Sequence, residues 1–279
     1  PYIRTMTEKF LSLEGVSVHI GNKKILNNLN INILRGEQWA ITGPSGSGKS
    51  VLAHTLMDRH FYTGQITWHQ PGTRIAIVEQ QHRFLNRSGT TDLYYQQRFN
   101  ASDADQTITV EQELAPYVAE WSSRKNSPSP DTLHTWEWLE HLHIRPLLSR
   151  PLIQLSNGEN KKVQIAKALL ASPKVLVLDQ PFVGLDVKAR AFLHQRINEL
   201  ADKGILIILA THSSEIPSCI TQVISLEKSK PAVFMERRAF DNQLPSLPVK
   251  KQPLNEALLK RVLNITPGGQ FNAVIQMKE

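Results

Sequence analysis

The chain has 279 residues, of which 41% are hydrophobic and 20% charged, a composition typical of a soluble globular protein. Its length allows a full core, and no apolar run approaches the roughly 18 residues that a membrane-spanning helix needs, so any membrane crossing is expected from another chain. The formal net charge of +7 is compatible with nucleic acid or anionic lipid as a partner, or simply with a solvated surface that has a site for polyphosphate, which the scattered basic residues favour. The single cysteine excludes an internal disulfide.

Apolar periodicity and turn residues predict an α/β fold. In chain order, the expected elements are strands over 10–20, 25–34 and 38–42, a helix over 51–56, strands over 64–68 and 75–78, helical stretches over about 84–150, a helix over 160–170, a strand over 174–179, a helix over 185–200 and a strand over 205–210. The runs 174–179 and 205–210 are continuously apolar, as expected of parallel strands that are buried on both faces. The first two strands alternate, and Gly21-Asn22 predicts a hairpin between them.

The segment GPSGSGKS, residues 43–50, lies between an expected strand and an expected helix and fits the pattern Gly-x-x-x-x-Gly-Lys-Ser/Thr. Its glycines allow backbone N–H groups to wrap a phosphate chain, Lys49 supplies a charge for the β- and γ-phosphates, and Ser50 supplies a hydroxyl for Mg²⁺. A glycine-rich surface turn is the alternative, which the flanking strand and helix disfavour. The expected phosphate contacts are Gly43, Pro44, Ser45, Gly46, Ser47, Gly48, Lys49, Ser50 and Val51. The sequence therefore predicts binding of a nucleoside triphosphate.

Two other polar segments follow expected strands. Asp179 ends one continuously apolar run, and Thr211-His212 follows the other. Because ligand groups lie at the carboxyl ends of parallel strands, Gly43, Asp179 and His212 are expected at one site. A lone histidine is more often structural, but its position here favours contact between His212 and a γ-phosphate.

The order of these motifs resembles the ATP-binding cassette (ABC) ATPases over residues 10–226. The matching segments are a Walker A motif at 43–50, a Q-loop glutamine at Gln80, a signature LSNGE at 155–159, a Walker B strand at 175–179, a D-loop at 184–186 and a switch histidine at His212. The resemblance implies an α/β fold with a P-loop NTPase (RecA-like) core, an N-terminal antiparallel β region and an inserted α-helical subdomain. The implied ATPase domain is 10–226, with its core at 10–83 and 161–226 and its helical subdomain at 84–160, followed by a linker or tail at 227–279.

The same resemblance implies a mechanism. Two such domains form a head-to-tail dimer with ATP between the Walker motifs of one and the signature of the other, so hydrolysis opens and closes the dimer. The implied cofactors are ATP and Mg²⁺, and the implied metal ligands are Ser50, Gln80 and Asp179. The implied catalytic residues are Gln80, Gln180, Asp186 and His212, and the implied signature contacts to nucleotide are Ser156, Asn157, Gly158 and Glu159.

Position 180 departs from the family pattern, in which a glutamate that takes a proton from the attacking water follows Walker B. Gln180 stands there, and its amide cannot accept a proton at neutral pH. Loss of a general base lowers rates by about 10²- to 10⁴-fold while ground-state binding persists, so we expect strong ATP binding with weak hydrolysis. Asp179 is kept, so Mg²⁺ is expected to stay bound. The sequence leaves open whether Gln180 is natural or a deliberate substitution, and an inert surface residue is the alternative.

The signature departs as well, with Asn157 and Glu159 in place of a glycine and a glutamine. Ser156 and Gly158, which supply a hydroxyl and an N–H to a γ-phosphate across the dimer, are kept. An ordinary helix N-terminus capped by Asn157-Gly158 is the alternative. The aromatic residue that stacks on adenine in many members falls near Ile20, which lacks a π-face, so a weaker adenine contact is expected.

Within the family, the stretches 93–100, 155–159 and 181–186 look most like the cytosolic tandem ATP-binding proteins of molybdate transport. Residues 271–279 alternate much as residues 10–15 do. This similarity motivates the hypothesis that the chain stops where a second ATPase half begins, and a stray edge strand is the alternative.

The leading function is the ATP-binding (ATPase) subunit of an importer-type ABC transporter, cytoplasmic and peripheral at the inner face of the membrane. Its implied partners are a second ABC ATPase domain, as a homodimer or tandem half, and membrane-spanning subunits that dock on the helical insert after Gln80. A soluble ABC ATPase that acts on ribosomes, nucleic acid or DNA repair is the alternative, which the basic charge keeps open. An ATP-controlled dimerisation switch is a third interpretation.

Overall fold

The computed structural model describes residues 8–80, 83–85, 91–93, 108–124, 140–228 and 230–243, and the structural statements below concern these residues. Contacts within the chain divide it into a unit from Pro1 to Phe240 and a unit from Asp241 to Glu279. The alternating segment 271–279, and most of the stretch 93–100, lie outside the described residues. Among the described residues, no helix combines the length and the apolar character that crossing a membrane requires.

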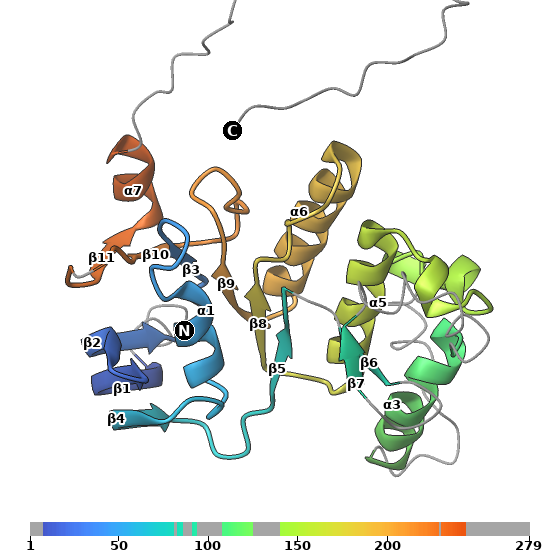
Figure 1. Cartoon of the computed structure of the whole chain (residues 1–279), viewed down its shortest axis with the longest axis horizontal. Helices are drawn as coiled ribbons and strands as arrows, with labels where there is room; N and C mark the ends of the chain where they lie inside the picture. Colours follow the sequence, from blue (N-terminus) through green and yellow to red (C-terminus); the bar gives the residue numbers. More distant parts are fainter. Residues whose placement is uncertain are drawn as a thin grey trace, which may run out of the picture. The chain divides into compact units, whose positions relative to one another are not determined.

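A six-stranded sheet forms the centre of the first unit (Figure 1). In the order β11-β10-β3-β9-β8-β5, its strands are β11 (Val233–Glu236), β10 (Gln222–Ser225), β3 (Trp39–Thr42), β9 (Leu206–Ala210), β8 (Val175–Asp179) and β5 (Ile75–Val78). All neighbouring pairs are parallel except β10 and β11, which are antiparallel. Every residue of β8 and β9 is buried, which confirms the interpretation of their continuous apolar runs.

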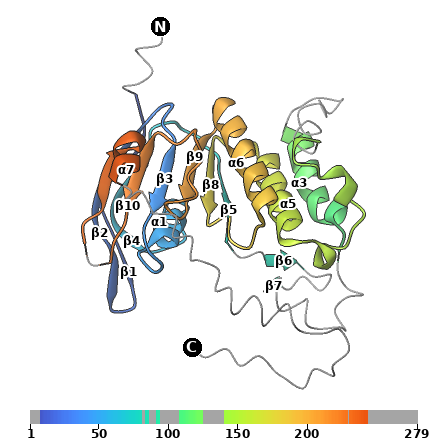
Figure 2. The same ribbon diagram turned by 90° about the horizontal axis from the view of Figure 1, so that it is seen from above.

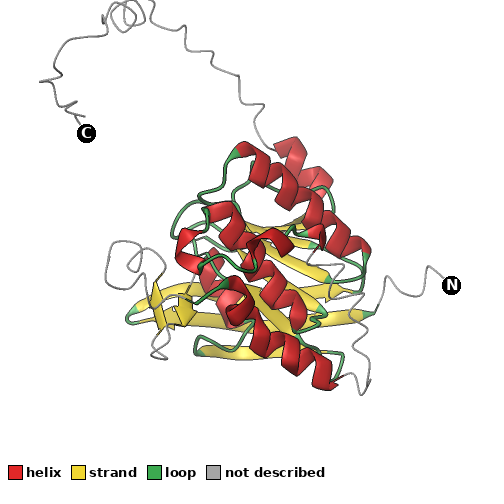
Figure 3. Cartoon of the chain, turned by 90° about the vertical axis from the view of Figure 1, so that its right-hand side faces the viewer, coloured by secondary structure: helices red, strands yellow, loops and turns green. Residues whose placement is uncertain are grey.

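The two faces of this sheet belong to different hydrophobic cores. Val175 and Val177 of β8 pack into one core, whereas Leu176 and Leu178 pack into the other, because successive side chains of a strand point to opposite faces. Helix α1 (Lys49–Thr55) covers the first face, and helices α5 (Asn157–Leu170) and α6 (Val187–Asp202) cover the second (Figure 2). Seen from the side of α5 and α6, the helices lie in a layer over the strands (Figure 3). This arrangement confirms the α/β class.

The predicted N-terminal antiparallel region is a three-stranded sheet of order β2-β1-β4. Its strands are β1 (Lys9–Ile20), β2 (Lys23–Leu34) and β4 (Tyr62–Trp68). The buried residues Leu11, Leu13 and Val18 of β1 share a core with α1, so this sheet covers the outer side of that helix. The hairpin turns at Gly21-Asn22, as predicted.

The expected helical stretch is only partly helical. Helix α3 (Val110–Arg124) packs on α5, and an ion pair of 2.5 Å joins Glu113 to Lys167 between them. Before α3, a short antiparallel hairpin joins β6 (Arg83–Leu85) to β7 (Thr91–Leu93), so the prediction of helix from residue 84 is wrong there. The sequence between these strands contains Ser88-Gly89, a turn-forming pair that the helical interpretation passed over. Two described 3₁₀ turns, Arg145–Leu147 and Leu152–Gln154, lead into α5.

The first unit extends beyond the expected domain boundary at residue 226. Strand β10 was not predicted, and β11 adds to it as an antiparallel edge before α7 (Arg237–Gln243) begins. Phe240 is buried in the same core as α5 and α6. Strands and helices stop alternating here, because β11 follows β10 through a hairpin, which needs no crossover helix.

Candidate functional site

The loop between β3 and α1 has a close neighbour at its first position. Gly43 has a φ of 138°, and a Cβ on this residue would lie 2.0 Å from the carbonyl oxygen of Leu226. The N–H of Leu226 donates to the carbonyl oxygen of Thr42 at 2.9 Å, so the chain after β10 runs directly against the loop. A side chain at position 43 would push the two segments apart, which explains the glycine.

Two polar side chains of the loop suit an anion. The buried Lys49 folds back so that its Nζ donates to the carbonyl oxygens of Gly43 and Pro44 at 2.8 and 2.9 Å. Burial lowers the pKa of Lys49, against the opposing effect of Asp179. The buried Oγ of Ser47 has no hydrogen-bond partner within the part of the chain that the structure describes. An ammonium and an unpaired hydroxyl in a glycine-rich loop fit a polyphosphate.

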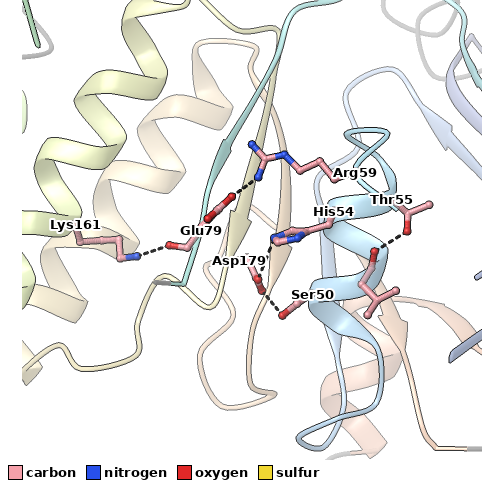
Figure 4. A network of polar contacts seen from close by, with 8 residues as sticks. Ser50, His54, Thr55, Arg59, Glu79, Lys161 and Asp179 are labelled. Carbon is pink, nitrogen blue, oxygen red and sulfur yellow. Dashed lines mark hydrogen bonds and ion pairs between the residues drawn. The ribbon is translucent and has the colours of Figure 1, made fainter. Parts of the chain in front are cut away.

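Asp179, the last residue of β8, points toward the start of α1, next to the phosphate loop (Figure 4). Its Oδ1 accepts a hydrogen bond from Oγ of Ser50 at 2.9 Å, and its Oδ2 lies 3.8 Å from Nε2 of His54. Burial raises the pKa of Asp179, whereas Ser50, His54 and Lys161 act in the opposite direction. A carboxylate and a hydroxyl oxygen side by side are ligands that Mg²⁺ prefers. The structure thus brings together Ser50 and Asp179, two of the three expected metal ligands.

Gln80, the third expected ligand, lies just after β5 and is exposed. No hydrogen bond between described residues joins it to Ser50 or Asp179. The neighbouring Glu79 makes the contacts at this point instead. Its backbone oxygen accepts a hydrogen bond from Nζ of Lys161 at 2.9 Å, and its carboxylate pairs with Arg59 (Figure 4).

Lys161 of α5 is a residue that sequence reasoning missed. Only 5% of it is exposed, and its Nζ also donates to Oε1 of Gln164 at 3.2 Å. Burial lowers the pKa of Lys161 to about 8, against the attraction of Asp179 and Glu79. A signal was available, because Lys161 shares the buried face of the helix with Ile165 and Leu169, which follow it at helical spacing.

Gln180 directly follows Asp179 and is half-buried. Its φ is 49°, a left-handed conformation that non-glycine residues adopt rarely. The backbone holds it there, because the N–H of Gln180 donates to the carbonyl oxygen of Ala210 at 2.8 Å, at the end of β9. The residue expected in place of a general base therefore lies in a strained turn between the ends of two central strands.

His212 and Asp186 are both exposed. His212 follows β9, and its Nδ1 lies 3.0 Å from Oγ of Ser214. Asp186 is the N-cap of α6, and its carboxylate accepts a hydrogen bond from the N–H of Ala189 at 2.8 Å. The structure places His212 beyond the end of a strand that neighbours both β3 and β8, as predicted, whereas the described contacts of Asp186 are those of a helix cap.

The signature segment begins α5, and its cap differs from the expected one. Ser156, rather than Asn157-Gly158, is the N-cap: its Oγ accepts from the N–H of Glu159 at 3.2 Å, and Glu159 accepts from the N–H of Ser156 at 2.8 Å. A serine hydroxyl and a glutamate three residues later satisfy each other's N–H groups, which the sequence reading overlooked. These hydrogen bonds and the ion pair with Arg150 lower the pKa of Glu159, although burial alone would raise it.

The D-loop lies beside the signature of the same chain. Nδ2 of Asn157 donates to the carbonyl oxygen of Gly184 at 3.3 Å, and Gly158 faces Ala189 closely enough that a Cβ would lie 3.2 Å from it. Ile20, at the end of β1, is 47% exposed, which leaves its apolar surface open.

Comparison with known proteins agrees with this geometry. A family model described as ABC transporter matches residues 26–183. The zinc import ATP-binding protein ZnuC of Psychrobacter cryohalolentis is 32% identical over 199 residues, covering 70% of each chain. ZnuC of Hydrogenovibrio crunogenus is 27% identical over 212 residues, covering 75% of each chain.

A solved structure shows the same fold. The structure of cbiO1 from Clostridium perfringens, part of the ABC transporter complex cbiONQ, superposes with a TM-score of 0.64 at 23% identity, covering 92% of this chain and 96% of that one. Neither the relatives' names nor this structure supports the expected molybdate-type branch, since the two relatives are named for zinc import.

Proposed function

The chain belongs to the ABC transporter family, and from this premise we propose that it is the ATP-binding subunit of an importer. The observation that carries the proposal is the phosphate loop with Lys49 folded over it and the hydrogen bond between Ser50 and Asp179 beside it. ATP is the proposed ligand of residues 43–51, with Lys49 binding its phosphates. Mg²⁺ is the proposed cofactor, with Ser50, Asp179 and Gln80 as its proposed ligands, and it supplies charge neutralisation to the phosphates when bound.

We propose that hydrolysis at this site is slow. An ABC-type ATPase needs a group that takes a proton from the attacking water, and the Gln180 amide has no basic lone pair for it at neutral pH. Gln180 can orient water by a hydrogen bond, and His212 is proposed to contact the γ-phosphate from the end of β9. Because hydrolysis is slow, the domain stays in its ATP-bound state for a long time.

A head-to-tail dimer is the proposed working form. Ser156 and Gly158 are proposed to contact the γ-phosphate bound by the partner domain, and Asp186 is proposed to lie at the same interface. Support comes from two exposed apolar side chains that flank the D-loop, Val183 at 51% and Val187 at 82% exposure. Exposed apolar groups on either side of the motif are compatible with a surface that a partner covers.

A groove beside the Q-loop is the proposed docking site for a membrane-spanning subunit. It encloses about 390 Å³ between β5, α3 and α5. Its lining combines apolar surface with a few charges: Met57, Arg59, Ile75, Ala76, Ile77, Val78, Glu79, Tyr117, Gln164, Lys167, Ala168 and Ala171. A lining of apolar and charged side chains suits an amphipathic helix of a partner.

The proposed cargo class follows the relatives rather than the molybdate resemblance. Both reported relatives are named for zinc import, so we place the chain with metal-ion importers. The alternative of action on ribosomes or nucleic acid rests on the basic charge, and no described contact adds to it.

The test is a titration of Mg-ATP into the full chain and two single-lysine variants. Lys49→Ala is expected to weaken ATP binding by at least about tenfold, because it removes a charge-assisted contact. Lys174→Ala is the matched control, since this exposed lysine precedes β8, at the end of the strand opposite to Asp179. Equal affinities in all three proteins would exclude the phosphate loop as the nucleotide site.

A further inference from the structure

The phosphate loop has a second lysine beside it that none of its motifs contains. A Cβ built on Gly46, which has a φ of 74°, would lie 3.2 Å from Cε and 3.4 Å from Nζ of Lys228. The end of the Lys228 side chain therefore lies beside Gly46 in the loop, next to the space that a side chain at position 46 would take. Lys49, by contrast, belongs to the loop itself and reaches its carbonyl oxygens from the helix side.

The segment that carries Lys228 is held against the loop by the backbone. The N–H of Leu226 donates to the carbonyl oxygen of Thr42, and the carbonyl oxygen of Leu226 occupies the space that a Cβ on Gly43 would need. Leu226 is buried in the core beneath α1. Lys228 is thus two residues from a fixed anchor, and its position beside the loop follows from the pairing of β10 with β3.

The charge of Lys228 is available to a ligand. Lys228 is exposed, and it forms no hydrogen bond or ion pair with another described residue. The acidic residue next to it is occupied, because Glu227 pairs with Lys230 at 2.6 Å. An uncompensated ammonium beside a glycine-rich loop attracts negative charge.

We propose that Lys228 is an additional nucleotide-binding residue, whose ammonium contacts the phosphate chain of the di- or triphosphate held by residues 43–50. It does from the β10 side of the loop what Lys49 does from the helix side. This inference rests on the proposed function, since it needs the nucleotide to lie in the loop. It adds a determinant of affinity outside the family's motifs, in the segment that leads to β11.

The experiment measures binding of Mg-ADP and Mg-ATP to the full chain by calorimetry, at low and high salt. Lys228→Gln is expected to weaken both nucleotides by about tenfold, because a charge-assisted hydrogen bond is lost. Lys228→Arg is expected to restore most of the affinity. The salt dependence of binding is expected to be smaller in Lys228→Gln than in the parent chain, since one of the screened attractions is gone.

Lys230→Gln is the matched control, because Lys230 is two residues away and already paired. It is expected to bind both nucleotides as the parent chain does. Unchanged ADP and ATP affinities in Lys228→Gln, with Lys49→Ala impaired, would overturn the role of Lys228 and leave the nucleotide site intact. Full affinity in Lys49→Ala would instead overturn the site itself and this inference with it. A loss equal in Lys228→Gln and Lys230→Gln would also overturn the inference, because it would reflect net charge alone.

Discussion

At the scale of single residues, the proposed chemistry depends most on position 180. Asp179 and Gln180 are consecutive, yet they do different things: the carboxylate of Asp179 points to Ser50, and the backbone of Gln180 turns away in a left-handed conformation tied to Ala210. Glutamine and glutamate have nearly the same shape. A change between them therefore alters proton chemistry without altering the turn.

Gln180→Glu is expected to raise the rate of ATP hydrolysis by about 10²- to 10⁴-fold, because it would supply the general base that we propose is missing. The measurement is steady-state phosphate release with Mg²⁺, beside the affinity for ATP, which is expected to change little. Gln180→Ala is the control and is expected to stay as slow as the parent chain. A Gln180→Glu variant that binds ATP and remains inactive would show that the defect lies elsewhere, in the signature or in a required partner domain.

At the scale of elements, Glu79, which directly follows β5, contacts one residue that follows α1 and one residue of α5. Arg59 follows α1 and pairs with the Glu79 carboxylate, while Lys161 of α5 reaches its backbone oxygen (Figure 4). Helix α1 begins at the phosphate loop and α5 begins at the signature, so both motifs are connected to the residue before Gln80. A movement of Gln80 that displaces Glu79 is therefore expected to shift the contacts of Glu79 with Arg59 and with Lys161.

Lys161 is expected to make a pH-dependent contribution to the free energy of unfolding. Burial lowers the pKa of Lys161 to about 8 in the folded chain, below the ordinary lysine value of 10.5, so between these pH values the unfolded chain binds more protons. The free energy of unfolding is therefore expected to rise with pH in this window, by a total on the order of 3 kcal/mol. Lys161→Met removes the titrating group and is expected to lack the rise.

Urea unfolding at pH 7.5, 9 and 10 without Mg²⁺ checks this prediction. Lys174→Met is the control, because Lys174 is exposed, and it is expected to follow the parent chain. Parallel pH profiles for the parent chain and Lys161→Met would show that the Lys161 ammonium does not titrate in this range.

At the scale of the whole molecule, exposed apolar residues on either side of the D-loop are one feature that a partner domain would explain. Leu185 of the same loop is buried and Gly184 is held by Asn157, so the loop is supported from within. Val183 and Val187 then point their side chains to solvent, where a second copy of the domain is proposed to cover them.

Val183→Asp is expected to abolish Mg-ATP-dependent dimerisation while leaving ATP binding to the monomer unchanged, because a charge at a packed interface is costly. Sedimentation velocity with and without Mg-ATP measures the dimer. Val233→Asp on β11 is the matched control, since Val233 and Val183 are both 51% exposed. Dimerisation that persists in Val183→Asp would place the interface on another face.

Several parts of the fold and site were predictable because their signals are local. The period-2 pattern gave β1 and β2 within two residues of their observed ends, and the continuous apolar run marked β8. Other parts were not predictable in this way. The strands β6 and β7 have three residues each, which is too short for a periodic signal. Strand β11 depends on its pairing with β10, which the local sequence does not reveal.

The sequence by itself determined the phosphate loop, the residues that follow the central strands and the family, because each is encoded in a few consecutive residue types. Only the tertiary structure decided which groups meet: Ser50 with Asp179, Lys161 with Glu79, and Lys228 with Gly46. The partners in these pairs lie far apart along the chain, and their contact depends on strand order and helix packing. A linear motif carries no information about such distances. Lys228 lies beside the phosphate loop because β10 pairs with β3, and this pairing is a property of the tertiary structure.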